Sequence, residues 1–452
     1  MTPDEYRRLD ATDLATLVRG GEVTDGEIRE AARAMHEGTD AAINAVVEWY
    51  DEPTAVRDLD GPLAGVPLLR KDYGSAEAGR LVEMGSALAQ GNRARTTGVF
   101  IDRLQAAGIQ ILGRSAVPEF IQHGTTESVV HGATLNPWDP TVSAGGSSGG
   151  ATAAVAAGVV PAAHASDCAG SIRIPAAACG LVGLKPSRRR VPWEDGGWGG
   201  IAEEFVVTRS VRDTEAFLGV LGDGPMLDAV GPLRIAVSTD HWGGFAPDPE
   251  VVAATEAVAT LLEDLGHRVT PIDPPLDAEL LAGTWHAFFS RWVAYDVATV
   301  ARQTGRQVGP ETLEPVTLAA VEAAASLTVS DITLAQIAQG RITERLRSDM
   351  ASHDVLLTPS LGRAVIPLGH VGGDVESMGQ YLRRNDELMP YSYLFNVTGW
   401  PALSVPAGWA AAGVPLGVQL AAPMGHEPVL LGLARTIEAS GLGSVLPDHR
   451  RL

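Results

Sequence analysis

Two serine-bearing, glycine-rich turns stand out in the middle of this 452-residue chain. The first runs from Gly145 to Gly150 and holds Ser147 and Ser148, and the second runs from Asp167 to Arg173 and holds Ser171. Glycine allows backbone conformations that other residues rarely adopt, and it lets a substrate approach the main chain closely. Because a nucleophilic hydroxyl needs that access, the two turns predict a serine hydrolase.

Lysine is rare in this chain: it occurs only at Lys71 and Lys185, and all the other basic residues are arginine. Arginine is effectively never deprotonated, whereas a buried lysine can lose its proton and act as a base. Lys71 follows the apolar run Val66–Leu69, so it ends a predicted strand, where burial would lower its pKa. The alternative is a surface lysine that pairs with the adjacent Asp72.

Three interpretations of the serine turns follow from the residues. Gly145-Gly-Ser-Ser-Gly149 satisfies the G-x-S-x-G pattern of an α/β-hydrolase nucleophile elbow, but that pattern is weak in a chain with 51 glycines. A phosphate-binding loop would need a lysine directly after its glycines, and none is present there. In the third interpretation a neutral Lys71 accepts the proton of one serine through the other, because serine needs a base to act as a nucleophile.

The order of the motifs resembles that of the amidase signature family. Lys71 stands in Gly65-Val-Pro-Leu-Leu-Arg-Lys-Asp72, which is followed by Gly145-Gly-Ser-Ser-Gly-Gly150 and then by Asp167-Cys-Ala-Gly-Ser-Ile-Arg-Ile-Pro-Ala176. The three motifs are also similar to the family in their separation along the chain. The similarity covers most of the sequence and is weakest between residues 270 and 350.

The resemblance implies a role for each of these residues. Ser171 is the expected nucleophile, Ser147 the serine that relays its proton, with a cis peptide bond before it, and Lys71 the base. Ser148, Asp167 and Arg173 are expected to support the two turns, Arg173 by bracing the loop. The expected oxyanion hole consists of backbone N–H groups, those of Cys168, Ala169, Gly170 and Ser171.

Cys168 and Ala169 depart from the pattern of the family, which usually has smaller residues or glycine at these positions. Backbone amides tolerate side chains, so we expect the departure to change the shape of the pocket rather than the oxyanion hole. Cys168 is also an alternative nucleophile, but the implied proton relay points to Ser171.

The second serine motif is similar to that of one branch of the family, which contains nylon-oligomer hydrolases, aryl acylamidases and urethane-cleaving amidases. The resemblance therefore implies hydrolysis of the C–N bond of small or aryl amides, with carbamates as a further substrate class and with no cofactor or metal. His123 is an alternative general base, although a lone histidine in a loop is more often only a hydrogen-bonding residue. The residues expected to shape the substrate pocket are Phe120, Ile121, Gln122, His123, Trp193 and Trp198.

Composition narrows the range of partners. A net charge of −21 argues against binding to nucleic acid or to an anionic membrane, since both require a positive field. Only two cysteines occur, Cys168 and Cys179, which favours a reduced, cytoplasmic setting. We expect a monomer or homodimer that acts on a small molecule. The alternatives are a glutaminase subunit of a tRNA-dependent amidotransferase, which would need partner subunits, and a non-catalytic binding protein on the same scaffold.

Helical and strand patterns alternate along the chain, which favours an α/β fold. The resemblance implies a mixed central β-sheet flanked by helices on both faces, in a single domain over residues 1–452 with a signature core at 61–190. Residues 270–350 are predicted to be a helical flank or insertion, and they show no obvious catalytic cluster. Ala41–Tyr50 is a predicted strand, and the Gly- and Ala-rich run Gly149–Gly158 predicts a helix that packs very close to neighbouring backbone.

Overall fold

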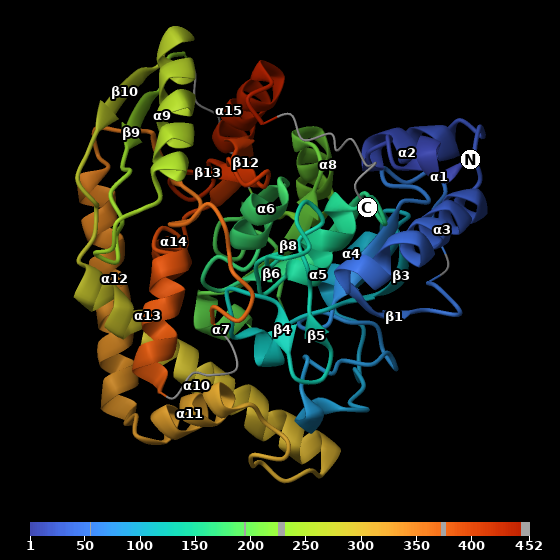
Figure 1. The fold of residues 1–452 in the computed structure, drawn as a ribbon, viewed down its shortest axis with the longest axis horizontal. Helices are drawn as coiled ribbons and strands as arrows, with labels where there is room; N and C mark the ends of the chain where they lie inside the picture. Colours follow the sequence, from blue (N-terminus) through green and yellow to red (C-terminus); the bar gives the residue numbers. More distant parts are fainter. Residues whose placement is uncertain (55, 194–195, 225–230, 372–376, 444–452) are drawn as a thin grey trace.

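The computed structural model describes residues 1–54, 56–193, 196–224, 231–371 and 377–443. A mixed sheet of eleven strands runs through this part of the chain (Figure 1). Its order is β1 (Val46–Trp49), β3 (Gln110–Ser115), β2 (Pro67–Lys71), β6 (Ala162–Asp167), β8 (Glu203–Thr208), β7 (Val182–Lys185), β12 (Ala402–Trp409), β13 (Pro415–Ala421), β11 (Val355–Pro359), β9 (Arg234–Val237) and β10 (Arg268–Pro271). A small second sheet pairs β4 (Glu127–Ser128) with β5 (Gly132–Ala133).

Parallel pairing in the first half of the sheet brings two chemically important strand ends together. Strand β2 lies between β3 and β6 and is parallel to both. The carboxyl ends of parallel neighbours meet at the same edge of a sheet, where α/β folds place their ligand sites. Lys71, the last residue of β2, therefore lies beside the end of β6, which leads into the second serine turn.

Helices cover both faces of the sheet, as expected (Figure 1). Leu416 and Gly417 of β13 point to opposite faces because side chains alternate along a strand. Leu416 shares an apolar cluster with α9 (Pro249–Asp264), whereas Gly417 lies against Ala177 of α6 (Arg173–Cys179). On the first face stand α9, α8 (Val211–Leu221) and α15 (Glu427–Ser440), and α6 and α5 (Gly149–Ala156) pack on the second.

The helix α5 approaches neighbouring backbone very closely, as its composition predicts. A Cβ added to Gly150 would lie 2.4 Å from the amide nitrogen of Ala116 and 2.6 Å from the carbonyl oxygen of Ala45. Real Cβ atoms do not come so near to backbone atoms, so only glycine fits. This contact seats the first serine turn, which opens α5, against the end of β3.

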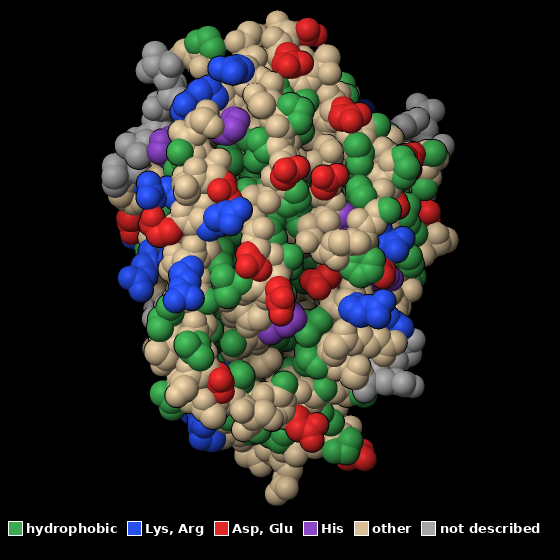
Figure 2. All heavy atoms as spheres, turned by 90° about the vertical axis from the view of Figure 1, so that its left-hand side faces the viewer, with side chains coloured by type: hydrophobic (Ala, Val, Ile, Leu, Met, Phe, Trp, Pro, Cys, Tyr) green, Lys and Arg blue, Asp and Glu red, His purple; other side chains and the backbone are tan. Residues whose placement is uncertain are grey.

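Further helices form a layer beside the sheet, at the lower left of Figure 1. They are α10 (Ala278–Thr304), α11 (Pro315–Ala325), α12 (Val329–Asp349), α13 (Met378–Leu388) and α14 (Tyr393–Thr398). Charged side chains of both signs are scattered among apolar ones over the face that carries α12 (Figure 2). Among the described residues, no single helix is long and apolar enough to cross a membrane; α11 and α12 pass that test only as a pair bent by 99°.

The remaining α-helices are α1 (Pro3–Tyr6), α2 (Ala11–Arg19), α3 (Asp25–Ile43), α4 (Val99–Ala106) and the short α7 (Gly196–Gly200). Helix α3 continues to Ile43 and ends on Asn44, which has the left-handed φ of 50°. The strand predicted over Ala41–Tyr50 is therefore wrong at its start, and β1 begins only at Val46. Ala41 and Ala42 are good helix formers, and nothing in the apolar pattern marks the point where the helix stops.

Replacing Gly150 with alanine should destabilise the protein, because the new methyl group would overlap the backbone of Ala116 and Ala45. Overpacking of this kind costs about 1–3 kcal/mol or more. Gly219 provides a matched control, because it also lies within a helix, α8, but has nothing within 4 Å of an added Cβ. Gly219→Ala should raise stability by about 0.5–1 kcal/mol through helix propensity. Urea denaturation of both variants measures the difference, and equal shifts in the same direction would contradict the contact.

Candidate active site

Lys71 is fully buried at the end of β2, where serine oxygens surround its amine. Its Nζ lies 2.8 Å from Ser147 Oγ, 2.7 Å from Ser148 Oγ and 3.0 Å from Ser166 Oγ, and 3.4 Å from the carbonyl oxygen of Ser166. No carboxylate contacts the amine among the residues that the structure describes. Burial lowers the pKa of Lys71 to about 7, although the charges of Asp167 and Glu204 act in the opposite direction.

The surface pairing of Lys71 with Asp72 is therefore excluded. Asp72 is also buried, and its Oδ1 lies 2.9 Å from Arg114 Nη1. Arg114 in turn pairs with Glu48 and Glu83. The neighbouring acid is occupied by this arginine, so Lys71 lacks a carboxylate partner there.

The first serine turn has the cis peptide bond that the resemblance implies, between Gly146 and Ser147. Ser147 is fully buried, and its carbonyl accepts a hydrogen bond from Thr126 Oγ1 at 3.4 Å. The same threonine oxygen accepts a hydrogen bond from the N–H of Gly149 at 3.0 Å. Thr126 thus bridges the turn and the start of α5, a role that the sequence did not indicate.

The second serine turn holds Ser171, which is 5% exposed and whose hydroxyl makes no hydrogen bond within the described ranges. Gly170, directly before it, has a φ of +123°, and an added Cβ would lie 2.7 Å from Ile174 and from Ser392. Only glycine suits that position. The turn therefore presents a hydroxyl that is free to react, in place of one engaged in a structural contact.

Asp167 fixes the backbone of this turn. Its Oδ1 accepts a hydrogen bond from the N–H of Gly170 at 2.7 Å, and its Oδ2 one from the N–H of Ile172 at 3.2 Å. Of the four amides expected to form an oxyanion hole, Gly170 is thus engaged by Asp167. The N–H groups of Cys168, Ala169 and Ser171 have no acceptor among the described residues.

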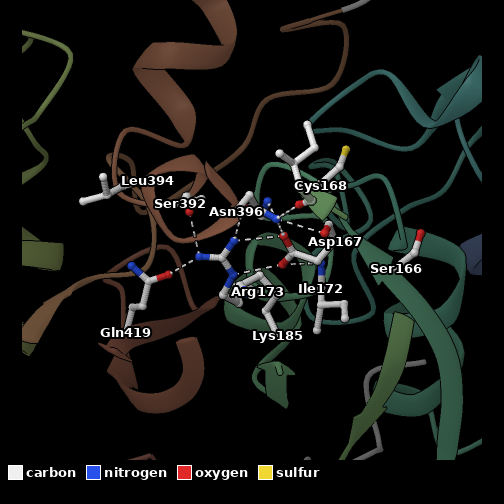
Figure 3. Close-up of polar contacts among 12 residues, drawn as sticks. Ser166, Asp167, Cys168, Ile172, Arg173, Lys185, Ser392, Leu394, Asn396 and Gln419 are labelled. Carbon is white, nitrogen blue, oxygen red and sulfur yellow. Dashed lines mark hydrogen bonds and ion pairs between the residues drawn. The ribbon is translucent and has the colours of Figure 1, made fainter. Parts of the chain in front are cut away.

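Arg173 braces the loop, as expected, through a buried network (Figure 3). Its Nε and Nη2 each lie 2.9 Å from the carboxylate of Asp167. The guanidinium also donates to the Ser392 carbonyl at 3.0 Å, to Gln419 Oε1 at 2.6 Å and to Asn396 Oδ1 at 2.8 Å. Burial by itself would raise the pKa of Asp167, but the charge and hydrogen bonds of Arg173 outweigh it and lower the pKa to about 2.

Asn396 of α14 completes this network and was not foreseen from the sequence. Its Nδ2 donates at 2.9 Å to both the backbone oxygen and the Oδ1 of Asp167, and at 3.0 Å to the carbonyl of Ile201. Ser166 was also missed, although it directly precedes the serine motif that begins at Asp167. The signal that could have found Ser166 is the parallel pairing of β6 with β2, which places its hydroxyl at the level of Lys71.

Cys168 has the surroundings of a structural thiol. Its side chain is buried, and burial raises the pKa of the thiol to about 12. The thiolate is the reactive form, so Cys168 is a poor nucleophile near neutral pH. Its carbonyl accepts a hydrogen bond at 3.2 Å from the indole N–H of Trp285, which lies on α10.

This contact brings the helical layer to the second serine turn, which the sequence did not predict. Trp285 and Phe289 of α10 stack with ring centroids 4.7 Å apart, and Phe289 lies 6.1 Å from Trp198 and 6.2 Å from Tyr381. We refer to these four rings as the aromatic wall. Only Trp198 among them belongs to the pocket residues expected from the sequence.

The other expected pocket residues lie around this wall. Phe120, Ile121, Gln122 and His123 are buried in a tight turn, where Gln122 Nε2 donates to Thr317 Oγ1 of α11 at 2.5 Å and the Gln122 carbonyl accepts from the Tyr381 hydroxyl. The His123 ring lies 5.6 Å from that of Tyr381, and its two nitrogens have no hydrogen-bond partner within the described ranges. Trp193 packs against the apolar cluster that contains the four rings, and it lines a neighbouring cavity with Tyr73.

No group of three or more His, Cys, Asp or Glu side chains within the described part of the chain is arranged to hold a metal ion. What the site does contain is a buried amine in contact with the hydroxyls of Ser147, Ser148 and Ser166, and a further serine, Ser171, in a turn with free amides. A base, a hydroxyl and amide donors in this arrangement can support acyl transfer.

Comparison with known proteins agrees with this chemistry. The sequence model of the Amidase family matches residues 27–431. The chain is 33% identical over 468 residues to a 6-aminohexanoate-cyclic-dimer hydrolase of Paenarthrobacter ureafaciens, covering 95% of this chain and 94% of that protein. It is 35% identical over 476 residues to the putative amidase AmiB2 of Mycobacterium tuberculosis, covering 97% and 98% of the two chains.

Solved structures give the same result. A 6-aminohexanoate cyclic dimer hydrolase complexed with substrate matches with a TM-score of 0.89 and 31% identity, covering 98% of both chains. A bacterial aryl acylamidase of the amidase signature family matches in fold with a TM-score of 0.84 at 23% identity, over 98% of both chains. The chain described here therefore belongs to the amidase family, the hydrolases that act on the C–N bonds of amides.

Proposed function

We propose that this amidase cleaves small and aryl amides through a Ser171 acyl-enzyme, with Ser147 as the proton relay and Lys71 as the base. The observation that carries the proposal is the 2.8 Å contact between Lys71 Nζ, which is buried and has a pKa of about 7, and Ser147 Oγ. A base with a pKa near neutrality is well matched to proton transfer under physiological conditions.

The reaction begins when Ser171 Oγ attacks the amide carbonyl. The Ser171 proton passes to Ser147, while Ser147 gives its own proton to the neutral amine of Lys71. The departing amine takes a proton back along the same path, and water then attacks the acyl-enzyme to release a carboxylate. The Ser171 and Ser147 hydroxyls share no hydrogen bond among the described contacts, so the relay requires them to meet when substrate binds, as is common for catalytic hydrogen bonds.

The amides of Cys168, Ala169 and Ser171 are the donors that we propose for the oxyanion. Their N–H groups have no acceptor in the described residues, whereas that of Gly170 holds Asp167. Preorganised donors of this kind stabilise the charge that develops on the carbonyl oxygen. The buried contacts of Asp167 with Arg173 support the proposal, because they keep the turn in one conformation.

Small and aryl amides are the substrate class that we propose. Relatives in the branch hydrolyse 6-aminohexanoate cyclic dimer, as their names state, and the aromatic wall offers flat apolar surface beside the nucleophile turn. Carbamates, like amides, have a carbonyl carbon bonded to a nitrogen leaving group, so we include carbamates in the proposed substrate class. The residues around 270–350 would then supply part of the substrate pocket.

The two free cysteines are consistent with a cytoplasmic enzyme, because disulfides are rare in that compartment.

The test of the substrate class is a panel of chromogenic anilides, carbamates and esters, with Ser171→Ala as the background. We expect anilide turnover by the chain in isolation, as a monomer or homodimer. Turnover that required partner subunits would favour a glutaminase subunit instead. Failure of Ser171 to react with a fluorophosphonate probe would favour a non-catalytic binding protein.

Removal of either serine hydroxyl should abolish turnover. Ser171→Ala removes the nucleophile and Ser147→Ala interrupts the relay, so we expect each kcat to fall by about 10⁴-fold or more. Ser360→Ala is the control, because Ser360 is also buried and, within the described part of the chain, its hydroxyl bonds only to that of Ser404. Steady-state kinetics on an anilide measures the effect, and near wild-type turnover by Ser171→Ala would sink the mechanism.

The rate should depend on the protonation of Lys71. Because only the neutral amine accepts a proton, kcat/KM should rise with pH through about 7 and then level off. Below that pH the lysine is protonated and activity is lost. Lys71→Arg should be almost as damaging as Lys71→Ala, since arginine does not deprotonate. A kcat/KM that does not change with pH across the neutral range, or an active Lys71→Arg variant, would contradict the role of Lys71 as the base.

A further inference from the structure

Two adjoining cavities lie between the segment 73–98 and the second half of α10. One has a volume of about 380 Å³ and the other about 300 Å³, and they share Asn92, Arg93, Arg95 and Gln303. The small helix η1 (Ala87–Ala89) packs on α10 beside them, at the lower end of the molecule in Figure 1. We refer to the two cavities together as the arginine cleft.

The smaller cavity is lined by three arginines and by no carboxylate. Arg93, Arg95 and Arg306 line it together with asparagine, glutamine, threonine and glycine. None of the three makes an ion pair with a described residue. In a chain with a net charge of −21, three guanidinium groups around one cavity without an acidic partner form an unusual local positive field.

Two of these guanidinium groups are held in place by backbone carbonyls. Arg306 Nη1 donates to the carbonyls of Ala87 at 3.1 Å and Gln90 at 2.5 Å, and Arg93 Nη1 donates to that of Gly79 at 2.7 Å. Carbonyls fix a guanidinium without neutralising its charge. The remaining N–H groups of both arginines are thus available, and the exposed Arg95 makes no hydrogen bond among the described contacts.

The larger cavity adds apolar and aromatic surface. Tyr73, Val82, Met84, Trp193 and Tyr295 line it. Asp296 is the one acidic residue among its described lining residues, and its Oδ2 accepts a hydrogen bond from the Tyr73 hydroxyl at 2.7 Å. The same hydroxyl accepts a hydrogen bond from Trp198 Nε1 at 2.7 Å, so the cleft adjoins the aromatic wall.

We infer that the arginine cleft binds a small organic carboxylate, with its carboxylate on Arg93, Arg95 and Arg306 and its apolar body against Tyr295 and Trp193. Arginine presents paired N–H donors that match the geometry of a carboxylate. Amide hydrolysis releases a carboxylate, so the ligand has two chemical sources: the acyl part of the enzyme's own substrate or product, or a separate carboxylate that acts as an effector.

Isothermal titration calorimetry with benzoate tests the inference. We expect Arg95→Ala to weaken benzoate binding about tenfold and Arg93→Ala/Arg95→Ala further, because each loses a charge-assisted hydrogen bond. Both side chains are exposed, so the variants should fold. Arg8→Ala, at an exposed arginine near the N-terminus, is the matched control and should bind as the wild type does. Benzyl alcohol, the uncharged analogue, should bind much more weakly than benzoate.

A second comparison tests the apolar half of the cleft. Benzoate should bind more tightly than acetate, and Tyr295→Ala should reduce that difference, because Tyr295 is exposed at the cavity wall. Added salt should weaken benzoate binding by screening the arginines. Equal benzoate affinity in Arg95→Ala and the wild type, an equal loss in Arg8→Ala, or equal binding of benzyl alcohol would overturn the inference.

The source of the ligand follows from inhibition kinetics on a neutral anilide. Competitive inhibition by benzoate that is lost in Arg95→Ala identifies the cleft as part of the substrate or product site, whereas non-competitive inhibition or activation identifies an effector site. Calorimetry requires no turnover, and it can be repeated with Ser171→Ala. A wrong assignment of the catalytic residues therefore does not affect the binding result.

Discussion

Burial of the Lys71 amine without a carboxylate in contact is the constraint on which the site depends. A protonated lysine at this depth would need a counter-charge, because transfer of an unpaired charge from water into a protein interior is strongly unfavourable. The sheet surrounds Nζ instead with hydroxyls, those of Ser147, Ser148 and Ser166. Hydroxyls can donate as well as accept, so they can solvate a neutral amine without stabilising its charged form as a carboxylate would. The parallel strands β3 and β6 lie on either side of β2, and Lys71, its last residue, is fully buried.

The surroundings of the nearby Asp167 favour its charged form, in contrast to those of Lys71. It is as deeply buried as Lys71, yet the guanidinium of Arg173, the amide of Asn396 and two backbone N–H groups satisfy its oxygens, and its pKa falls. One region of the protein thus holds an acid in its charged form and an amine whose pKa lies near neutrality, so that it can lose its proton. Separation of two protonation states by environment is typical of sites that move protons. Lys185 is also buried but differs from Lys71 in its contacts: its Nζ donates to the Pro186 carbonyl at 2.7 Å and to no serine in the described part of the chain.

The sequence predicted the parts of the site that are encoded locally. Glycine-flanked serines and a lysine after an apolar run marked Lys71, Ser147 and Ser171 as candidates before the fold was known. The resemblance to the amidase signature family gave each its expected role, and the alternating patterns favoured an α/β fold. Contacts between distant segments carry no such signal. Trp285 meets Cys168 across 117 positions and Asn396 meets Asp167 across 229, and both look like ordinary helix residues in the sequence. The same limit applies to Ser166, whose relation to Lys71 depends on which strands are neighbours.

Some of the backbone amides of the second serine turn donate to Asp167, and others have no acceptor among the described residues. A carboxylate that fixes a turn accepts hydrogen bonds from some of the N–H groups of that turn. Asp167 accepts those of Gly170 and Ile172. These two flank Ser171 in the sequence, so the residue between them is held on both sides while its own amide and hydroxyl stay free. Gly170 has a φ of +123°, a backbone conformation that other residues rarely adopt, so the path of the turn at this point depends on glycine. A side chain at Gly170 would meet Ile174 and Ser392, so the conformation of this turn also requires glycine directly before Ser171.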